Sequence, residues 1–396
     1  MRPSPSRQSD FVSDRGTAKY FHGRKKILQD FGALLVYSSK NKSGTTFLIQ
    51  GAPGAGKSAL LEECEKRARE KGWKTAEIKP QAFWDPDALR DFLGLGKFPW
   101  STFRSLKIGV SGASVTVGRA SRTIRKILRK GKQPLLLILD EAQTLKTSPH
   151  PPDDRGTNLE FMLDEIHNGK MDRPVILIAA GLGTTVDAFK SLGISRFSET
   201  CLVELGALGK EPERAVLHDW LTKEGEAKGD PTVWIETIAQ ETYGWPQHIV
   251  SYAKPALKQL EADNRVMTAD GLNAVLEAGR GFRSDYYERR AHGFAREYRH
   301  CLARVFADIP LGESTTYTVI LSSLTQEYDE TKAEKLFHLG RERGLLEDRK
   351  GYYAIPIPSM QDWLVTNYAH IQTKSPPQTM EIRRSSGRNP GMDLGR

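Results

Sequence analysis

The sequence predicts an α/β fold in which helices cover both faces of a parallel sheet, followed by a small helical region and a third unit that combines helices with a hairpin. Three observations lead to this prediction. Short apolar segments alternate with helical segments between residues 45 and 204, as is typical of parallel strands buried on both faces. A glycine-rich turn follows the first apolar segment. Beyond residue 204 the strand-like segments stop and amphipathic helical segments begin.

The sheet region is expected to begin with a strand at residues 45–50, a tight turn, and a helix from about residue 57 to 71. Further strands are predicted at 74–78, 135–139, 175–180 and 201–204. A helical segment at 158–168 lies among them. Residues 106–118, LKIGVSGASVTVG, alternate apolar and small polar residues around a Ser-Gly turn, which predicts an inserted hairpin.

The C-terminal half is expected to be mainly helical. Short amphipathic helices are predicted at 212–224, 233–242 and 247–260. A long Arg-rich helical region at about 280–306 leads to two helices, at 316–326 and 330–343. A small hairpin is then predicted from 344–348 and 352–355. Two helices joined by a short turn and followed by a hairpin are the pattern of a winged helix.

These elements divide the chain into three units between two tails. Residues 1–19 and 371–396 are rich in Ser, Pro, Arg and Gly, so we expect them to be disordered. The expected units are an α/β domain at 20–206, a helical lid subdomain at 207–279 and a winged-helix-like domain at 280–370. A chain of 396 residues is long enough for each unit to bury a core.

Composition excludes several classes of protein. The three cysteines lie far apart without paired spacing, so neither a disulfide framework nor a structural zinc site is indicated. The apolar runs are far shorter than the roughly 18 to 20 residues that a membrane-spanning helix needs. Residues 1–19 lack the apolar centre of a secretory signal. We therefore expect a soluble, cytoplasmic protein with no membrane partner.

Residues 51–58, GAPGAGKS, fit the phosphate-loop pattern GxxxxGK[ST], and the loop lies between a predicted strand and a predicted helix, as the chemistry requires. Its glycines allow backbone N–H groups and the helix N-terminus to face phosphate oxygens. Lys57 is expected to reach the β and γ phosphates, and Ser58 to bind Mg²⁺. The predicted nucleotide-binding residues of this loop are Gly51, Ala52, Pro53, Gly54, Ala55, Gly56, Lys57, Ser58 and Ala59.

The apolar strand predicted at 135–139 ends in two carboxylates, Asp140 and Glu141. Asp140 can hold Mg²⁺ through water, and Glu141 can polarise a water that attacks the γ phosphate. Such a strand ending would by itself indicate no more than solvated acids. Downstream of a phosphate loop it predicts hydrolysis of ATP.

Three segments together resemble the AAA+ ATPases, namely residues 51–58, Leu135 to Gln143, and Tyr20 to Arg24 ahead of the first strand. The resemblance is strongest to the clade of origin-recognition initiators and bacterial transposition ATPases, and it covers about residues 20–260 well. It implies the P-loop NTPase fold, ATP and Mg²⁺ as cofactors, and a site in which Phe21 and Arg24 lie against the adenine. A solvated turn is the alternative for that segment.

The resemblance also assigns residues outside the two motifs. Arg196 is similar in position to the arginine finger, which completes the site of a neighbouring subunit and so implies a homo-oligomer formed with ATP. Thr184 is a weak counterpart of the sensor-1 residue, with a helix N-cap as the rival role. Gln247 follows Gly244-Trp-Pro, where the family has an arginine that touches the γ phosphate. Because glutamine carries no charge, turnover can be slow, or Lys254 can replace that arginine.

Positive charge is concentrated in one stretch. The chain has 58 Lys and Arg against 49 Asp and Glu, a formal net charge of +9, and residues 97–132 contain ten basic and no acidic residues. A helix over residues 119–130 would separate an apolar side from a basic side. That basic side carries Arg119, Arg122, Arg125, Lys126, Arg129 and Lys130. A nucleic-acid backbone fits this face, and an acidic protein or a membrane surface fits it too.

These observations favour an ATP-dependent, oligomeric switch or loader that associates with double-stranded DNA. The alternative is a nucleotide-dependent signalling scaffold whose C-terminal domain contacts a protein partner. A metabolic NTPase or kinase ranks below both, because no small-substrate motif accompanies the phosphate loop. Charge on the predicted second helix of the winged helix, from Lys332, Lys335, His338 and Arg341, agrees with DNA contact, although winged helices also bind proteins.

Overall fold

The computed structural model describes residues 18–78, 133–147, 173–192 and 199–369, together with the single positions 163, 166, 167, 194 and 197. The predicted hairpin at 106–118 and the predicted basic helix at 119–130 lie outside the described residues, as do nearly all of both predicted tails. No helix in the described parts of the chain is both long and apolar enough to cross a membrane.

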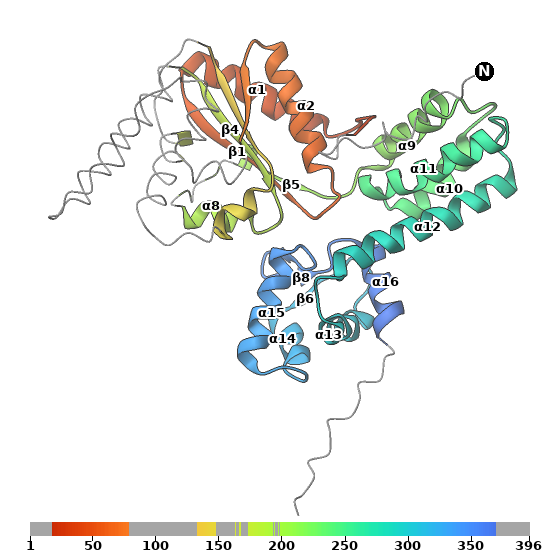
Figure 1. Cartoon of the computed structure of the whole chain (residues 1–396). Coiled ribbons are helices and arrows are strands. Elements are labelled where there is room, and N and C mark those ends of the chain that lie inside the picture. Colours follow the sequence, from red (N-terminus) through yellow and green to blue (C-terminus); the bar gives the residue numbers. More distant parts are fainter. Residues whose placement is uncertain are drawn as a thin grey trace, which may run out of the picture.

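A five-stranded parallel sheet forms the centre of the N-terminal region (Figure 1). Its strands are β1 (Gly44–Gly51), β2 (Lys74–Ile78), β3 (Leu135–Leu139), β4 (Val175–Gly181) and β5 (Leu202–Leu205). They are arranged in the order β2-β3-β4-β1-β5, and every neighbouring pair is parallel. The predicted parallel sheet is thus confirmed, and β1 and β3 end at the same edge on either side of β4.

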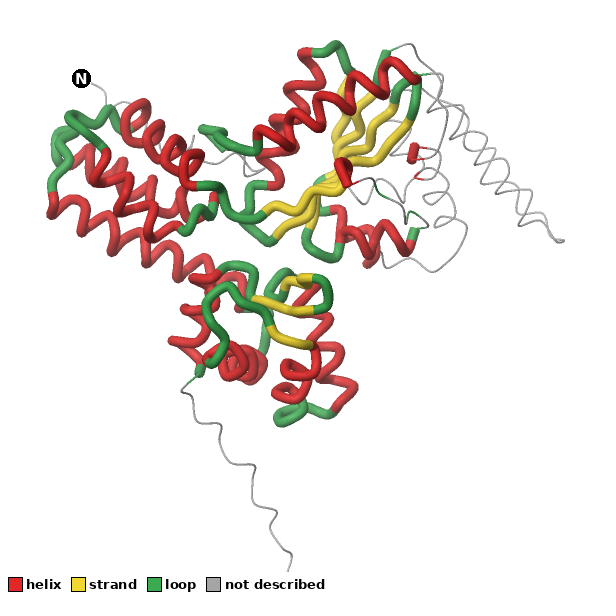
Figure 2. The backbone as a smooth tube through the Cα atoms, turned by 180° about the vertical axis from the view of Figure 1, so that it is seen from behind, coloured by secondary structure: helices red, strands yellow, loops and turns green. Residues whose placement is uncertain are grey.

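Helices cover both faces of this sheet (Figures 1 and 2). Helices α1 (Lys25–Asn41) and α2 (Lys57–Glu70) share one buried apolar cluster with alternate strand residues, such as Leu136 and Ile138. Helix α8 (Thr185–Ser191) and the short 3₁₀ helix η2 (Ala142–Thr147) share a second cluster with the intervening residues of the same strands. Successive strand residues point to opposite faces, which explains why these strands are apolar throughout.

The region after the sheet is helical and has a core of its own. It contains α9 (Lys210–Asp219), a π-helical turn η4 (Trp220–Glu224), α10 (Thr232–Thr242) and α11 (Pro246–Ala262), here called the lid helices. Helix α12 (Ala269–Ala291) packs along α11 and continues out of this region. The predicted domain boundary at residue 280 therefore lies within a continuous helix. Gly279 of that helix is buried against Tyr252, and a Cβ at this position would lie 2.2 Å from the tyrosine ring.

The third unit follows α12 and contains four helices and three short strands in the described chain. These elements are α13 (Arg296–Ala307), β6 (Thr315–Thr316), α14 (Tyr317–Leu324), α15 (Glu330–Glu342), β7 (Glu347–Arg349), β8 (Tyr352–Ala354) and α16 (Pro358–Tyr368). The strands form an antiparallel sheet in the order β6-β8-β7. The helices at 316–326 and 330–343 and the hairpin occur where the sequence predicts them, whereas β6 and α16 were not predicted.

Several arginines of the Arg-rich region at 280–306 form ion pairs within the fold. Arg280 and Arg283 both pair with Glu241 of α10. Arg299 donates to Glu288 at 3.0 Å and to the hydroxyl of Tyr368. These arginines connect α12 and α13 to their neighbours, so their charge is largely used within the fold.

Candidate nucleotide site

The segment 51–58 forms a tight loop between β1 and α2. Gly54 and Gly56 have φ values of 78° and 89°, a conformation that other residues rarely adopt. Gly51 lies against β5, where a Cβ would stand 2.6 Å from the carbonyl oxygen of Leu205. The glycines are therefore required by backbone shape, and Gly56 places Lys57 and Ser58 at the N-terminus of α2.

Lys57 is buried, and its Nζ donates to the carbonyl oxygens of Gly51 at 2.9 Å and Ala52 at 3.0 Å. Burial lowers the pKa of Lys57 to about 8, although the nearby carboxylates of Glu141 and Asp140 oppose this shift. The ammonium group is thus held by weak acceptors of the loop itself. An anionic ligand in the loop would satisfy it better.

Ser58 and Asp140 meet at the edge of the sheet where β1 and β3 end. The Ser58 hydroxyl donates to Asp140 Oδ2 at 2.7 Å. A hydroxyl and a carboxylate side by side are hard oxygen ligands of the kind that Mg²⁺ prefers. Within the described residues, no group of three or more His, Cys, Asp or Glu could hold a metal ion. This donor set fits Mg²⁺, which typically takes its other ligands from substrate phosphates and water.

Glu141 is held in a strained conformation next to this pair. Its φ of 54° is unusual for a residue other than glycine, and its N–H donates to Asp140 Oδ1 at 2.9 Å. The carboxamide of Gln143 donates to Glu141 Oε2 at 2.5 Å and accepts from Leu182 N at 3.0 Å. Gln143 thus links the end of β4 to the Glu141 carboxylate, a role that sequence analysis missed.

Neither predicted role of Thr184 is evident in the structure. Thr184 stands at the N-cap of α8, but its side chain makes no capping hydrogen bond, and it is absent from the residues that line the nucleotide cavity. At the neighbouring Gly181, a Cβ would lie 2.4 Å from Gln143 Oε1. The space beyond β4 is therefore occupied by Gln143.

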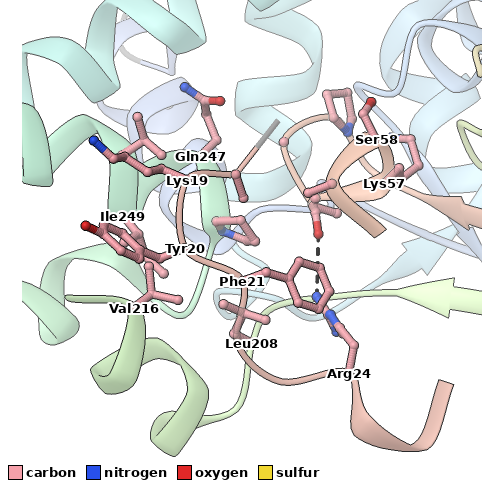
Figure 3. Close-up of a pocket in the computed structure, with 18 of the residues that line it drawn as sticks. Lys19, Tyr20, Phe21, Arg24, Lys57, Ser58, Leu208, Val216, Gln247 and Ile249 are labelled. Carbon is pink, nitrogen blue, oxygen red and sulfur yellow. Dashed lines mark hydrogen bonds between the residues drawn. The ribbon is translucent and has the colours of Figure 1, made fainter. Parts of the chain in front are cut away.

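A cavity of about 390 Å³ joins the phosphate loop to the lid helices. In Figure 3 the side chains of Phe21, Leu208 and Val216 gather at one end, and Lys57 and Ser58 lie at the other. Glu141 also lines the cavity. An apolar end and a cationic end in one cavity suit a ligand with a flat base and a chain of phosphates.

Arg24 lies beside Phe21, but its guanidinium donates to backbone carbonyl groups. Its Nη2 donates to the carbonyl oxygen of Gly206 at 2.5 Å and to that of Ala55 at 3.5 Å, the contact dashed in Figure 3. Burial lowers the pKa of Arg24. Both Phe21 and Arg24 line the cavity. Phe21 faces the ligand space, and Arg24 ties the phosphate loop to the segment after β5.

The lid contacts the phosphate loop through two hydrogen bonds of its Gly-Trp-Pro-Gln segment. Gln247 N donates to Gly54 O at 3.2 Å, and Trp245 Nε1 donates to Pro53 O at 3.2 Å. The side chain of Gln247 lines the cavity, as predicted, whereas Lys254 is exposed and is absent from the lining. Two residues that sequence analysis missed do line it, namely Tyr286 and Arg290 of α12.

The cavity brings together most of the predicted site residues. Pro53 to Ala59, Phe21, Arg24, Glu141 and Gln247 all line it, and Asp140 reaches it through Ser58. Gly51 and Ala52 contribute the carbonyl groups that hold Lys57. Arg196 and the six residues of the predicted basic face lie outside the described residues.

Comparisons with known proteins agree with this geometry. Residues 47–205 match the model of the ATPase family associated with various cellular activities (AAA). No curated protein sequence matches the chain. The ORC2 protein of Aeropyrum pernix in its ADP form is 13% identical, with a TM-score of 0.55 over 90% of this chain and 97% of that chain. The Walker-type ATPase PABY2304 of Pyrococcus abyssi is 14% identical, with a TM-score of 0.51 over 88% and 97%.

At these identities the structural likeness shows the fold alone. The family match, in contrast, spans β1, the phosphate loop, β3 with its carboxylates, β4 and β5. These are the elements that build the cationic end of the cavity. Residues 47–205 of this chain therefore form a domain of the AAA ATPase family.

Proposed function

We propose that this protein binds ATP with Mg²⁺, hydrolyses it, and acts as an ATP-dependent, oligomeric switch or loader that associates with double-stranded DNA. The observation that carries the proposal is the hydrogen bond of 2.7 Å between Ser58 and Asp140. It joins the phosphate loop to the carboxylate end of β3 inside a cavity that also holds Lys57 and Glu141.

Each side chain has a distinct task in this proposal. Lys57 leaves its two loop carbonyls and binds the β and γ phosphates. Ser58 and Asp140 hold Mg²⁺, which neutralises charge on the phosphate oxygens. Glu141 orients a water and accepts its proton as the oxygen attacks the γ phosphate. Gln143 fixes the direction of the Glu141 carboxylate through the bond of 2.5 Å, so that the acceptor is positioned before ATP arrives.

The DNA part of the proposal rests on charge. The basic face predicted at 119–130 belongs to a stretch, 97–132, that contains no acidic residue, and such a face attracts a phosphate backbone. Lys332, Lys335 and His338 of α15 are exposed and agree with contact by the third unit, which we interpret as a winged helix. Arg341 is excluded from that surface, since it lies 3.3 Å from both Asp187 and Asp348.

The oligomeric part rests on Arg196, which we propose as the finger that reaches the site of a neighbouring subunit. Sedimentation of the full chain tests both parts together, with and without ATP and a DNA duplex. We expect ATP to increase the assembly size, and the duplex to co-sediment with the protein. A chain that stays monomeric with ATP yet hydrolyses it normally would contradict the finger role.

Charge reversal at Arg122, Arg125 and Arg129 tests the DNA contact directly. Duplex affinity should fall, and its salt dependence should become less steep, because fewer counterions are released on binding. Reversal of Lys254, which is exposed on α11, is the control. Unchanged affinity and unchanged salt dependence in the triple variant would rule out DNA binding at this face.

A further inference from the structure

We propose that Arg290 of helix α12 is a phosphate-contacting residue of the nucleotide site, and that through Arg290 the bound nucleotide acts on the third unit. This inference rests on the proposed binding of ATP at Lys57. It concerns a residue outside the AAA family match, which ends at residue 205.

Arg290 lies in the cavity beside the phosphate loop. Tyr286 and Arg290, which are four residues apart and therefore on the same side of α12, line the cavity together with Lys57, Ser58 and Glu141. Arg290 is near enough to influence Lys57: burial is the main cause of the lowered pKa of Lys57, and the positive charge of Arg290 adds to it. Two positive charges that face one cavity repel each other, and an anion bound between them offsets this repulsion.

No carboxylate in the described parts of the chain pairs with Arg290. Within the described chain, Arg290 Nη2 donates to the carbonyl oxygen of Arg343 at 2.8 Å. Two other arginines of the Arg-rich region behave differently, since Arg283 pairs with Glu241 and Arg299 with Glu288. Most of the guanidinium's donors at Arg290 thus remain for a ligand, and a guanidinium has five N–H groups in a geometry that suits phosphate.

Tyr286 gives a second, independent indication of a ligand. Its hydroxyl is buried and has no hydrogen-bond partner among the described residues. It lies at the bend of the phosphate loop, where a Cβ on Gly54 would be 3.0 Å from Tyr286 Oη. A buried hydroxyl without a hydrogen-bond partner is uncommon in a folded protein, and a phosphate oxygen in the cavity would supply the missing acceptor.

The glutamine at 247 explains why a cation from elsewhere is needed. Gln247 holds Gly54 through its backbone N–H, and its side chain lines the cavity without contributing charge. Lys254 is exposed and does not reach the cavity. Besides Lys57, the cavity is lined by Lys19, Arg24 and Arg290. Lys19 pairs with Glu224 and Arg24 donates to backbone carbonyl groups, whereas Arg290 has no carboxylate partner among the described residues.

Arg290 is also connected to the third unit. It donates to Arg343 O, and Arg343 Nη1 donates in return to Gly293 O at 2.8 Å, so the end of α12 and the end of α15 hold each other. The next residue, Gly344, touches the phosphate loop, since a Cβ there would lie 3.0 Å from Pro53 Cδ. Figure 1 shows α15 beside the part of the sheet domain that carries α8.

These contacts give the coupling a physical form. Because the guanidinium has five donors, Arg290 can bind a phosphate oxygen and keep its bond to Arg343 O at the same time. Bound ATP then fastens the junction of α12 and α15 to the phosphate loop. Loss of phosphate releases one side of that connection, so the third unit senses the state of the nucleotide.

Nucleotide affinity of the full chain tests the first half of this inference. We expect Arg290→Ala to weaken binding of ATP by about tenfold or more, as loss of a charge-assisted hydrogen bond does. Arg289→Ala is the matched control, because Arg289 is the exposed neighbour on the same helix and does not line the cavity; its affinity should stay within about twofold of wild type. Arg290→Gln removes the charge but can still donate to Arg343 O, so it serves if the alanine variant folds poorly.

Hydrogen exchange of residues 339–346 tests the second half. Saturating ATP should slow exchange there in the wild type and in Arg289→Ala, and should leave it unchanged in Arg290→Gln. Equal ATP affinity and equal exchange in the Arg290 and Arg289 variants would overturn the inference. Lys57→Ala separates this failure from failure of the proposed function: if Lys57→Ala also binds ATP as the wild type does, nucleotide binding at the loop itself is wrong.

Discussion

The burial of Lys57 should make the affinity for ATP depend on pH. Burial lowers the pKa of Lys57 to about 8 in the free protein. Bound phosphates favour the charged form and raise that pKa, so binding takes up a proton at pH values between about 8 and the raised pKa of the complex. The protonated fraction of a group with this pKa falls from about nine-tenths at pH 7 to about one-tenth at pH 9. The dissociation constant for ATP should therefore rise about tenfold between pH 7 and pH 9.

Titration of the full chain with a fluorescent ATP analogue at several pH values measures this effect. Lys57→Met removes the titrating group, so its weaker binding should be independent of pH. A wild-type ATP affinity that is constant from pH 7 to pH 9 would contradict the titration of Lys57 on binding. The same change of affinity with pH in Lys57→Met would contradict it too.

Three further substitutions test packing, one beside the site and two in helix α12. Gly181→Ala places a methyl group against Gln143 Oε1, so ATP turnover should fall by up to about a hundredfold through misplacement of the proposed catalytic carboxylate, while calorimetry should find ATP affinity nearly unchanged. Gly279→Ala places its methyl group against the ring of Tyr252 and should lower the free energy of unfolding by about 1 to 3 kcal/mol. Gly281→Ala has open space and should raise the free energy of unfolding by about 0.5 to 1 kcal/mol. Equal denaturation midpoints for these two variants would contradict the packing of α12 against Tyr252.

The phosphate loop and the carboxylates of β3 could be predicted because their geometry is local. A strand, a turn that needs glycines and a helix N-terminus are all specified within residues 45–58, and Asp140 follows directly from the end of a buried strand. Parallel strands end at one edge of the sheet. The bond between Ser58 and Asp140 is therefore a consequence of the strand order, and the sequence pattern contains most of the information needed to expect it.

The residues that sequence analysis missed depend on packing between distant elements. Gln143 has a role because Gly181 leaves room for its carboxamide next to Leu182. Arg290 belongs to an Arg-rich stretch, and nothing in that pattern separates an arginine that faces the cavity from those, such as Arg283, that pair with Glu241. The glycine at 279 of α12 likewise matters because of the ring of Tyr252 in another helix, which leaves no room for a Cβ there.

The proposed hydrolysis of ATP through Glu141 is tested most directly by comparing turnover in the full chain and in Glu141→Gln. Turnover is measured with Mg²⁺, and ATP affinity is measured in parallel. The substitution keeps the shape of the side chain and removes the proton acceptor. We expect turnover to fall by about a hundredfold or more, while ATP affinity stays close to the wild-type value. Turnover that persists in Glu141→Gln at the wild-type rate would show that hydrolysis does not proceed through this carboxylate.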